Sequence, residues 1–233
     1  MQLKRRTGSV GDWLAEHKHL FLLLYYPIWF LWFQLLERRN THVTLWIKSP
    51  LDDYIPFISL FVIPYVLWFF YVAAGLAVTG LKDRDIFIKL CISLYIGMTI
   101  SNIVYYFIPH GQPLRVPLTA NETDFFSRIV YGIYSSDTPT NCAPSIHVLN
   151  SMAVNFAVQK SDLFRHRPFL RAGSHLLNIL IILSTMFIKQ HSIVDVALGL
   201  ILGGGIYLLV YTVDWRDVWQ TARKSLAPEQ TRV

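Results

Sequence analysis

Charged residues are scarce in this 233-residue chain, because Asp, Glu, Lys and Arg together supply only 15% of it, against about 25% in soluble domains. Repeats, low-complexity stretches and Gly/Ser linkers are also missing, which argues against a solenoid or separate domains. The two cysteines, Cys91 and Cys142, form neither a zinc-binding spacing nor a disulfide framework. Apolar residues dominate instead: 53% of the chain is hydrophobic and 15% is aromatic, which is typical of an integral membrane protein.

Long apolar runs recur between short polar segments. A helix needs about 20 apolar residues to cross a hydrocarbon core about 30 Å thick, and turn residues are too few within these runs to indicate strands. We therefore predict an all-α fold, a polytopic bundle of six transmembrane helices that forms one domain over residues 1–233. The predicted spans are residues 20–36, 57–80, 86–108, 145–159, 172–188 and 193–213, of which the fourth is short and the most polar.

Basic residues are distributed unequally between the two sides of this predicted bundle. With the N-terminus inside, fifteen of the 21 Lys and Arg residues lie in inner segments. Because positive residues are retained on the cytoplasmic side, we expect both termini to be cytoplasmic and the loop 109–143 to be external or lumenal. The positive residues flank spans instead of forming a stripe, so the net charge of +6 indicates anionic lipid headgroups and no nucleic acid as a partner. Residues 1–19 are predicted to be an interfacial helix or a tail.

The fourth span begins with Cys-Ala-Pro-Ser-Ile-His at residues 142–147. Pro144 suits the first turn of a helix, where its missing N–H is no loss, and Ser145 favours the same end. A helix N-terminus presents unpaired N–H groups and the positive end of the helix dipole, which together favour a phosphate oxygen. His147 is therefore expected beside a bound anion.

A second polar cluster, Lys-Gln-His-Ser-Ile-Val-Asp at residues 189–195, precedes the sixth span. On a helix His191 and Asp195 share a face, so the carboxylate can accept a hydrogen bond from one imidazole nitrogen. That bond fixes the tautomer and leaves the other nitrogen as an oriented nucleophile or base. Gly199 and Gly203 continue the same face and let the sixth span approach the fourth, which brings His147 towards His191.

Each of these residues also has a purely structural explanation. Asp195 can act only in a capping box with Ser192, and Arg115 or Lys189 can be a headgroup anchor or a snorkelling charge. His147 alone can mark a helix interface. These explanations give no reason for two histidines, an acid and an arginine on one side of the membrane, where ionisable residues usually face the bundle interior and serve a function. We therefore predict one pocket at that side.

The two polar segments resemble the second and third signature motifs of the type 2 phosphatidic acid phosphatase superfamily. The three motifs of that family read Lys-x6-Arg-Pro, Pro-Ser-Gly-His and Ser-Arg-x5-His-x3-Asp. Six spans with the motifs on one face agree with the family, so the resemblance covers most of the chain. The matching residues are Pro144, Ser145 and His147 in the second motif and Ser184, His191 and Asp195 in the third.

The sequence departs from the family pattern in all three motifs, and the affected positions of the first and third motifs normally hold the phosphate. Thr185 stands where the third motif has its arginine, and Ile146 replaces the glycine of the second motif. The first motif is reduced to Arg115, with no lysine seven residues earlier. Residues 52–57 and 190–199 look closer to the branch that includes inositol phosphorylceramide synthase-like lipid phosphotransferases, whose third motif also tends to lack the arginine.

The resemblance implies a mechanism that needs no metal and no cofactor. In that mechanism His191 attacks phosphorus to give a phosphohistidine, Asp195 orients His191, and His147 protonates the leaving alcohol. Backbone N–H groups help to hold the anionic oxygens, and we conjecture that a lysine replaces the absent arginine. The predicted phosphate-binding residues are Arg115, Ser145 and Lys189.

Three functions are consistent with this reading. The first is a membrane lipid-phosphate phosphatase that hydrolyses a phosphomonoester or pyrophosphate of a lipid. The second is a phosphotransferase that moves a phospho-headgroup between lipids, and the third is a non-catalytic lipid-binding or transport relative. For an enzyme we expect a multi-pass protein of the plasma membrane, with its active site on the non-cytoplasmic face. The lipid and the oligomeric state are left open by the sequence.

Overall fold

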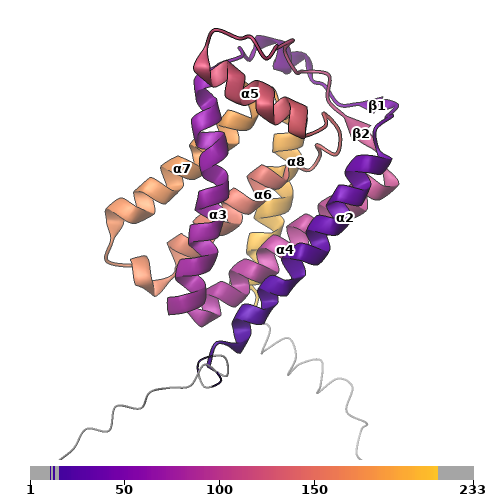
Figure 1. Cartoon of the computed structure of the whole chain (residues 1–233). Coiled ribbons are helices and arrows are strands. Elements are labelled where there is room, and N and C mark those ends of the chain that lie inside the picture. Colours follow the sequence, from indigo (N-terminus) through magenta and orange to yellow (C-terminus); the bar gives the residue numbers. More distant parts are fainter. Residues whose placement is uncertain (1–10, 12, 14–15, 215–233) are drawn as a thin grey trace, which may run out of the picture.

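The computed structural model describes residues 11, 13 and 16–214, which are almost entirely helical (Figure 1). The predicted tail or interfacial helix at residues 1–19 falls largely outside the described residues. The main helices are α2 (Tyr25–Arg39), α3 (Val62–Lys82), α4 (Arg84–Phe107), α5 (Phe125–Ser136), α6 (Ile146–Lys160), α7 (Pro168–Phe187) and α8 (Ile193–Tyr207). Short 3₁₀ segments are η1 (Lys18–Leu24), η2 (Pro50–Tyr54), η3 (Ser59–Phe61) and η4 (Asp162–Phe164), and a π-helical turn, η5 (Leu208–Thr212), follows α8.

Five helices in the described part of the chain are long and apolar enough to cross a membrane. The segments are Lys18–Arg39, Ser59–Lys82, Arg84–Phe107, Pro168–Phe187 and Ile193–Thr212. They correspond to five of the six predicted spans. The remaining predicted span, residues 145–159, forms α6, which has 15 residues and so extends about 22 Å at 1.5 Å per residue. The all-α fold is therefore confirmed in the described residues, five helices are long and apolar enough for a multi-pass membrane protein, and α6 is a shorter helix.

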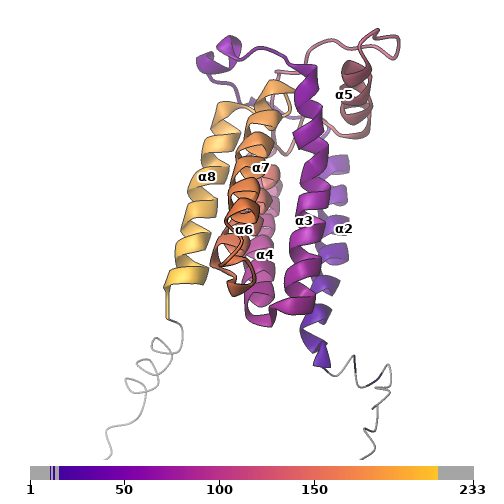
Figure 2. The same cartoon turned by 90° about the vertical axis from the view of Figure 1, so that its left-hand side faces the viewer.

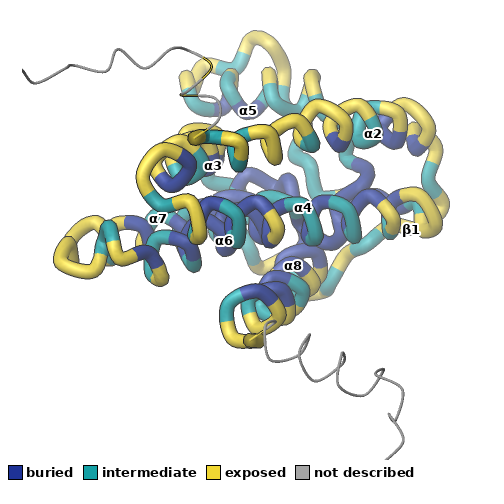
Figure 3. Tube along the Cα trace, turned by 90° about the horizontal axis from the view of Figure 1, so that it is seen from below, coloured by how far each residue is buried: buried dark blue, intermediate teal, exposed yellow. Residues whose placement is uncertain are grey.

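Helix α6 lies at the centre of the bundle, in contact with α3, α4, α7 and α8. Every residue from Val148 to Asn155 is buried, so no face of this stretch is left for lipid. Figure 3 shows α6 mostly buried, whereas α2 and α3 carry exposed residues along their lengths. Large side chains such as Phe30 and Phe70 are exposed there, as expected for helices that face acyl chains.

Glycines on α8 allow α6 to approach closely, as the sequence predicted. A Cβ atom added to Gly199 would lie 3.0 Å from the Cβ of Val148 and 3.2 Å from the carbonyl oxygen of Ser145. One added to Gly203 would lie 2.9 Å from the sulfur of Met152. A side chain at Gly199 would crowd a backbone oxygen, so the glycines allow the close spacing between the two segments that carry the histidines.

The loop 109–143 is folded rather than open. It contains α5 and the short strand β2 (His110–Gly111), which pairs in parallel with β1 (Leu45–Trp46). Val130 of α5 is fully buried in a cluster with Tyr65 of α3 and Ile188, which follows α7. This loop and the strands lie at the end of the bundle opposite to the start of α2 and the end of α8 (Figures 1 and 2). The described chain thus enters and leaves the bundle at one end, and the predicted site lies at the other.

Candidate functional site

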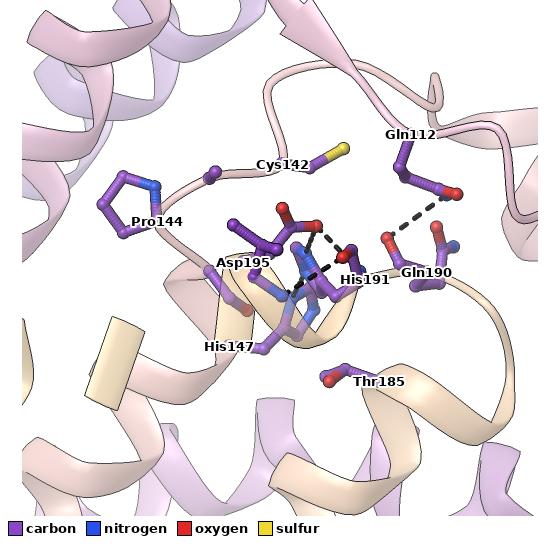
Figure 4. Close-up of polar contacts among 12 residues, drawn as sticks. Gln112, Cys142, Pro144, His147, Thr185, Gln190, His191 and Asp195 are labelled. Atoms are coloured by element: carbon purple, nitrogen blue, oxygen red, sulfur yellow. Dashed lines mark hydrogen bonds and ion pairs between the residues drawn. The ribbon is translucent and has the colours of Figure 1, made fainter. Parts of the chain in front are cut away.

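The two polar segments meet where α6 and α8 begin (Figure 4). Nδ1 of His147 lies 3.3 Å from Nε2 of His191. The backbone N–H of Ser145 also donates to the carbonyl oxygen of Asp195 at 3.2 Å, so the two helix starts are joined directly. The predicted proximity of the histidines is therefore present in the structure.

Asp195 holds both the start of α8 and the ring of His191. Its Oδ2 atom accepts from the backbone N–H of Ser192 at 2.9 Å, completing a capping box, and lies 3.3 Å from Nδ1 of His191. An ionised carboxylate can only accept, so the contact places a proton on Nδ1 of His191. The Nε2 atom of a neutral His191 then carries a lone pair, directed towards His147. Asp195 therefore both caps α8 and orients the ring of His191.

Aromatic side chains of α3 fix the ring of His147. Its centroid lies 4.6 Å from that of Tyr65 and 4.5 Å from that of Trp68, and both aromatic residues are buried. Nothing in the local sequence around His147 signals these two neighbours, since they come from a different helix. Their contacts place the ring beside His191.

Ser145 is the N-cap of α6, and its Oγ atom accepts from the backbone N–H of Val148 at 3.5 Å. Helix α6 begins at Ile146, so Pro144 precedes the cap, and its expected place in the first helical turn is wrong. Ser145 is completely buried and is not part of the cavity described below. The first two helical residues, Ile146 and His147, do line it, and N–H groups at such positions have no partner within the helix.

Arg115 crosslinks the loop around the site. Its guanidinium donates to the carbonyl oxygens of Tyr134, Asp137 and Thr138 at 2.7–2.9 Å and to Oε1 of Gln190 at 2.9 Å. All four terminal N–H groups are therefore engaged with protein oxygens. Arg115 is close to the histidines through Gln190, but it does not line the cavity.

Lys189 and Thr185 both point away from the histidine pair. The ammonium group of Lys189 donates to the carbonyl oxygens of Asp52 and Ile55, in the segment between α2 and α3. The hydroxyl of Thr185 donates to the carbonyl oxygen of Ile182, within its own helix. The polar groups of both side chains are therefore bonded to carbonyl oxygens, and neither residue lines the cavity described below.

A cavity of about 650 Å³ connects the histidines with the outer surface of the bundle. Gln190, His191 and His147 line one part of it, and aromatic residues of α2 and α3 line another. Residues of α5 and of the loop 137–142 complete the wall. Among the aromatic residues, Phe30 and Phe69 are about half exposed on the outside of their helices. The cavity therefore extends from the histidine pair to the surface that faces the bilayer between α2 and α3.

Polar groups that sequence reasoning missed surround the inner part of the cavity. Glu37, at the end of α2, accepts from the hydroxyl of Thr138 and from the side-chain amide of Asn141. Burial and the nearby Glu37 raise the pKa of Asp137, which also lines the cavity, to about 6. Glu37 contacts residues about a hundred positions away, so no local pattern could identify it.

Among the described residues that line the cavity, two carry a buried hydrogen-bond donor without a partner. The donors are Nε2 of Gln190 and Nε1 of Trp68. Because the guanidinium of Arg115 can only donate, it fixes the amide of Gln190 with Oε1 towards the arginine and Nε2 directed elsewhere. Buried polar groups without a partner are uncommon, so each such donor calls for an explanation.

Comparison with known proteins gave no family model, no curated protein and no solved structure that matches the chain. In the part of the chain that the structure describes, no group of three or more His, Cys, Asp or Glu side chains is arranged to hold a metal ion.

Proposed function

We propose that this protein is an integral membrane phosphatase of the type 2 phosphatidic acid phosphatase kind, which hydrolyses a lipid phosphate through a phosphohistidine at His191. The observation that carries the proposal is the His147–His191–Asp195 array at the inner end of a cavity that reaches the bilayer-facing surface. In this array Nε2 of His191 lies 3.3 Å from Nδ1 of His147, and Nδ1 of His191 lies 3.3 Å from Oδ2 of Asp195. A nucleophile, a base-orienting acid and a second imidazole within hydrogen-bond reach form the arrangement that covalent catalysis requires.

The proposed reaction has two steps. Nε2 of His191 attacks phosphorus, the bond between phosphorus and the lipid oxygen breaks, and protonated His147 gives its proton to that oxygen. Water then attacks the phosphohistidine, His147 accepts the proton of the water, and inorganic phosphate leaves while Nε2 of His191 recovers its electron pair. Asp195 stabilises the positive charge that develops on His191 in the first step.

The rings must separate before the reaction. A distance of 3.3 Å between Nδ1 of His147 and Nε2 of His191 leaves no room for a phosphorus atom between the two nitrogens. Entry of a phosphoryl group therefore requires His147 to rotate within its position between Tyr65 and Trp68. Neutral donors are available for the phosphoryl oxygens, namely the N–H groups that begin α6 and the unpartnered atoms of Gln190 and Trp68.

The shape of the cavity supports a lipid rather than a water-soluble phosphate. Its walls between α2 and α3 consist largely of aromatic side chains such as Phe30, Phe33 and Phe69, which suit an acyl or prenyl chain. We place the protein in the plasma membrane. The distribution of basic residues supports an orientation with both termini in the cytoplasm and the site on the non-cytoplasmic face.

The test is release of inorganic phosphate by the purified protein in detergent, from a panel that includes phosphatidate and a polyprenyl diphosphate. We expect turnover that orthovanadate inhibits and a chelator leaves unchanged. His191→Ala and His147→Ala should each reduce kcat by roughly three orders of magnitude or more, because each removes a group that acts in the chemical step. Unchanged function in both variants would instead support a non-catalytic lipid-binding or transport protein.

A second candidate function, phosphoryl or phospho-headgroup transfer to a lipid alcohol, is favoured by one observation. Asp137 lines the cavity beside His191, and its pKa, raised to about 6 by burial and by Glu37, suits a general base that activates an acceptor hydroxyl. The two functions share the histidine intermediate and differ in the acceptor. Addition of a diacylglycerol or ceramide acceptor should leave phosphate release unchanged for a phosphatase, whereas a transferase should form a new phosphorylated lipid.

A further inference from the structure

A carboxylate outside the cavity holds the turn that carries His191. Asp52 lies in η2, between α2 and α3, and only 1% of its surface is exposed. Its Oδ1 atom accepts from the backbone N–H of Ile193 at 2.8 Å, and Oδ2 accepts from the hydroxyl of Ser192 at 2.7 Å. The two segments are about 140 residues apart in the sequence, so this contact exists only in the folded chain.

The backbone of Asp52 binds the same turn from the other side of His191. Its carbonyl oxygen accepts from the ammonium group of Lys189 at 2.9 Å. Lys189 adopts a φ angle of 56°, a left-handed conformation that costs a residue other than glycine about 1–2 kcal/mol. The bonds from its ammonium group to Asp52 and Ile55 help to stabilise that conformation. Residues 189, 192 and 193 are thus all held by one residue, and His191 lies between them.

A continuous series of hydrogen bonds links Asp52 to the proposed nucleophile. The hydroxyl of Ser192 donates to Asp52, and the backbone N–H of Ser192 donates to Oδ2 of Asp195. The same Oδ2 atom orients Nδ1 of His191. A shift of Ser192 therefore moves both the carboxylate that orients the ring and the backbone that carries the ring.

Capping of η2 does not account for these contacts. A cap requires only the bond from the backbone N–H of Ser49 to Oδ2 of Asp52, which is present at 2.7 Å. The second oxygen of Asp52 is devoted to Ile193, and a buried carboxylate is tolerated only where donors replace its lost water. The neighbouring Asp53 shows the contrast, because it is exposed and pairs with Lys48 at the surface.

We propose that Asp52 is a positioning residue for His191, which fixes the turn 189–193 so that Nε2 of His191 points at the phosphoryl group. Asp52 does not line the cavity and so does not touch the substrate. The proposal rests on the proposed function for its catalytic consequence, and on the hydrogen bonds above for its structural content.

The test compares Asp52→Asn with the matched variant Asp53→Asn. Asparagine keeps the size of the side chain, but its amide group cannot accept from Ser49 and Ser192 as Oδ2 does. A misplacement of about 1 Å can cost about 100-fold in rate, so we expect kcat per folded molecule to fall about 10-fold to 100-fold in Asp52→Asn while KM changes less than about twofold. Asp53→Asn should keep both constants at the wild-type values.

A second readout does not require enzymatic activity. The rate at which diethyl pyrocarbonate modifies His191, followed by mass spectrometry of the folded protein in detergent, should shift in Asp52→Asn towards the rate of Asp195→Asn, which lacks the orienting carboxylate. Asp53→Asn should react like the wild type. If the wild type releases no phosphate from any lipid, the proposed function fails, and the reactivity of His191 alone decides the role of Asp52.

Two results would overturn the positioning role. One is an Asp52→Asn protein whose kcat and His191 reactivity both equal those of Asp53→Asn. The other is a loss of activity that matches the loss of folded protein, with kcat per folded molecule unchanged, since that pattern describes a residue that only stabilises the fold.

Discussion

The residues around the histidine pair offer neutral donors, because the nearby cations are engaged elsewhere in the fold. Arg115 is committed to carbonyl oxygens and to Gln190, and Lys189 is committed to the segment between α2 and α3. In the described part of the chain, two residues that line the cavity carry donors without a partner, Nε2 of Gln190 and Nε1 of Trp68. In a site shielded from water, a fixed neutral donor can stabilise developing negative charge strongly, so these two donors suit the proposed binding of a phosphoryl oxygen.

Gln190→Glu tests this use of neutral donors. The variant keeps an oxygen for Arg115 but replaces the free N–H group with a negatively charged oxygen, which repels an anion. We expect inhibition by orthovanadate to weaken about 10-fold or more, because a donor to a charged group is lost and a like charge is added.

Gln159→Glu is the matched control for that variant. Gln159 also presents Oε1 to an arginine, Arg171, but it does not line the cavity. Inhibition by orthovanadate should equal that of the wild type in this control. Equal inhibition in Gln190→Glu as well would show that Gln190 does not contact the phosphoryl group.

The raised pKa of Asp137 leads us to predict that substrate binding depends on pH. Burial and Glu37 raise its pKa from 3.8 to about 6, against the opposing effects of Arg115 and His191. A raised pKa means that the folded protein favours the protonated form, so any stabilisation is complete below the ordinary pKa and is lost as the pH rises through about 6. The side chain remains 42% exposed. We therefore expect ionisation of Asp137 to affect the binding of an anion more than the stability of the fold.

As the pH rises through about 6, ionisation of Asp137 should raise KM for an anionic lipid phosphate, because a negative charge appears beside the site. Asp137→Asn should remove this step while leaving the dependence of kcat on the histidines. KM measured across this pH range in both proteins checks the prediction, and an identical step in Asp137→Asn would contradict it.

At the scale of elements, the contact between α6 and α8 sets the distance between the two histidines. Gly199→Ala should force the helices apart, because the new Cβ would lie 3.2 Å from a backbone oxygen that cannot rotate away and 3.0 Å from Val148. We expect a loss of about 1–3 kcal/mol in stability and a fall in kcat of about 10-fold or more, since the rings are displaced.

Gly204→Ala is the control for this substitution. Gly204 lies on the same helix, and a Cβ added there has no atom within 4 Å. Alanine should raise the stability of the helix by up to about 1 kcal/mol and leave kcat unchanged. Thermal unfolding in detergent and kcat distinguish the variants, and full activity in Gly199→Ala would show that the contact tolerates the extra atom.

Sequence patterns predicted the elements that depend on local order. Apolar runs located the five long spans, and a period of four residues correctly assigned Gly199 and Gly203 to the face of α8 that meets α6. The same patterns missed α5, because its apolar face is buried by Tyr65 and Ile188, which belong to distant segments of the chain. They also placed Pro144 inside a helix that begins two residues later, at Ile146.

At the scale of the whole molecule, the candidate site was predictable only in part. The proximity of His147 and His191 followed from topology, because the two segments that carry them begin neighbouring helices at the same end of the bundle. The roles of Asp52, Glu37 and Trp68 depend on contacts across 79–141 residues of sequence, which no spacing rule reports. Motif residues such as Lys189 kept their positions in the chain but not their expected contacts.

The same topology makes the orientation of the whole molecule testable. The site end of the bundle carries Tyr54, which is 83% exposed, and the opposite end carries Arg165, whose side chain is 72% exposed. Both cysteines of the chain, Cys91 and Cys142, are buried, so a membrane-impermeant maleimide has little background. If basic residues keep their side of the membrane cytoplasmic, Tyr54→Cys should react in intact cells and Arg165→Cys only after permeabilisation. The reverse pattern would place the histidine pair on the cytoplasmic face and would require a substrate from the inner leaflet.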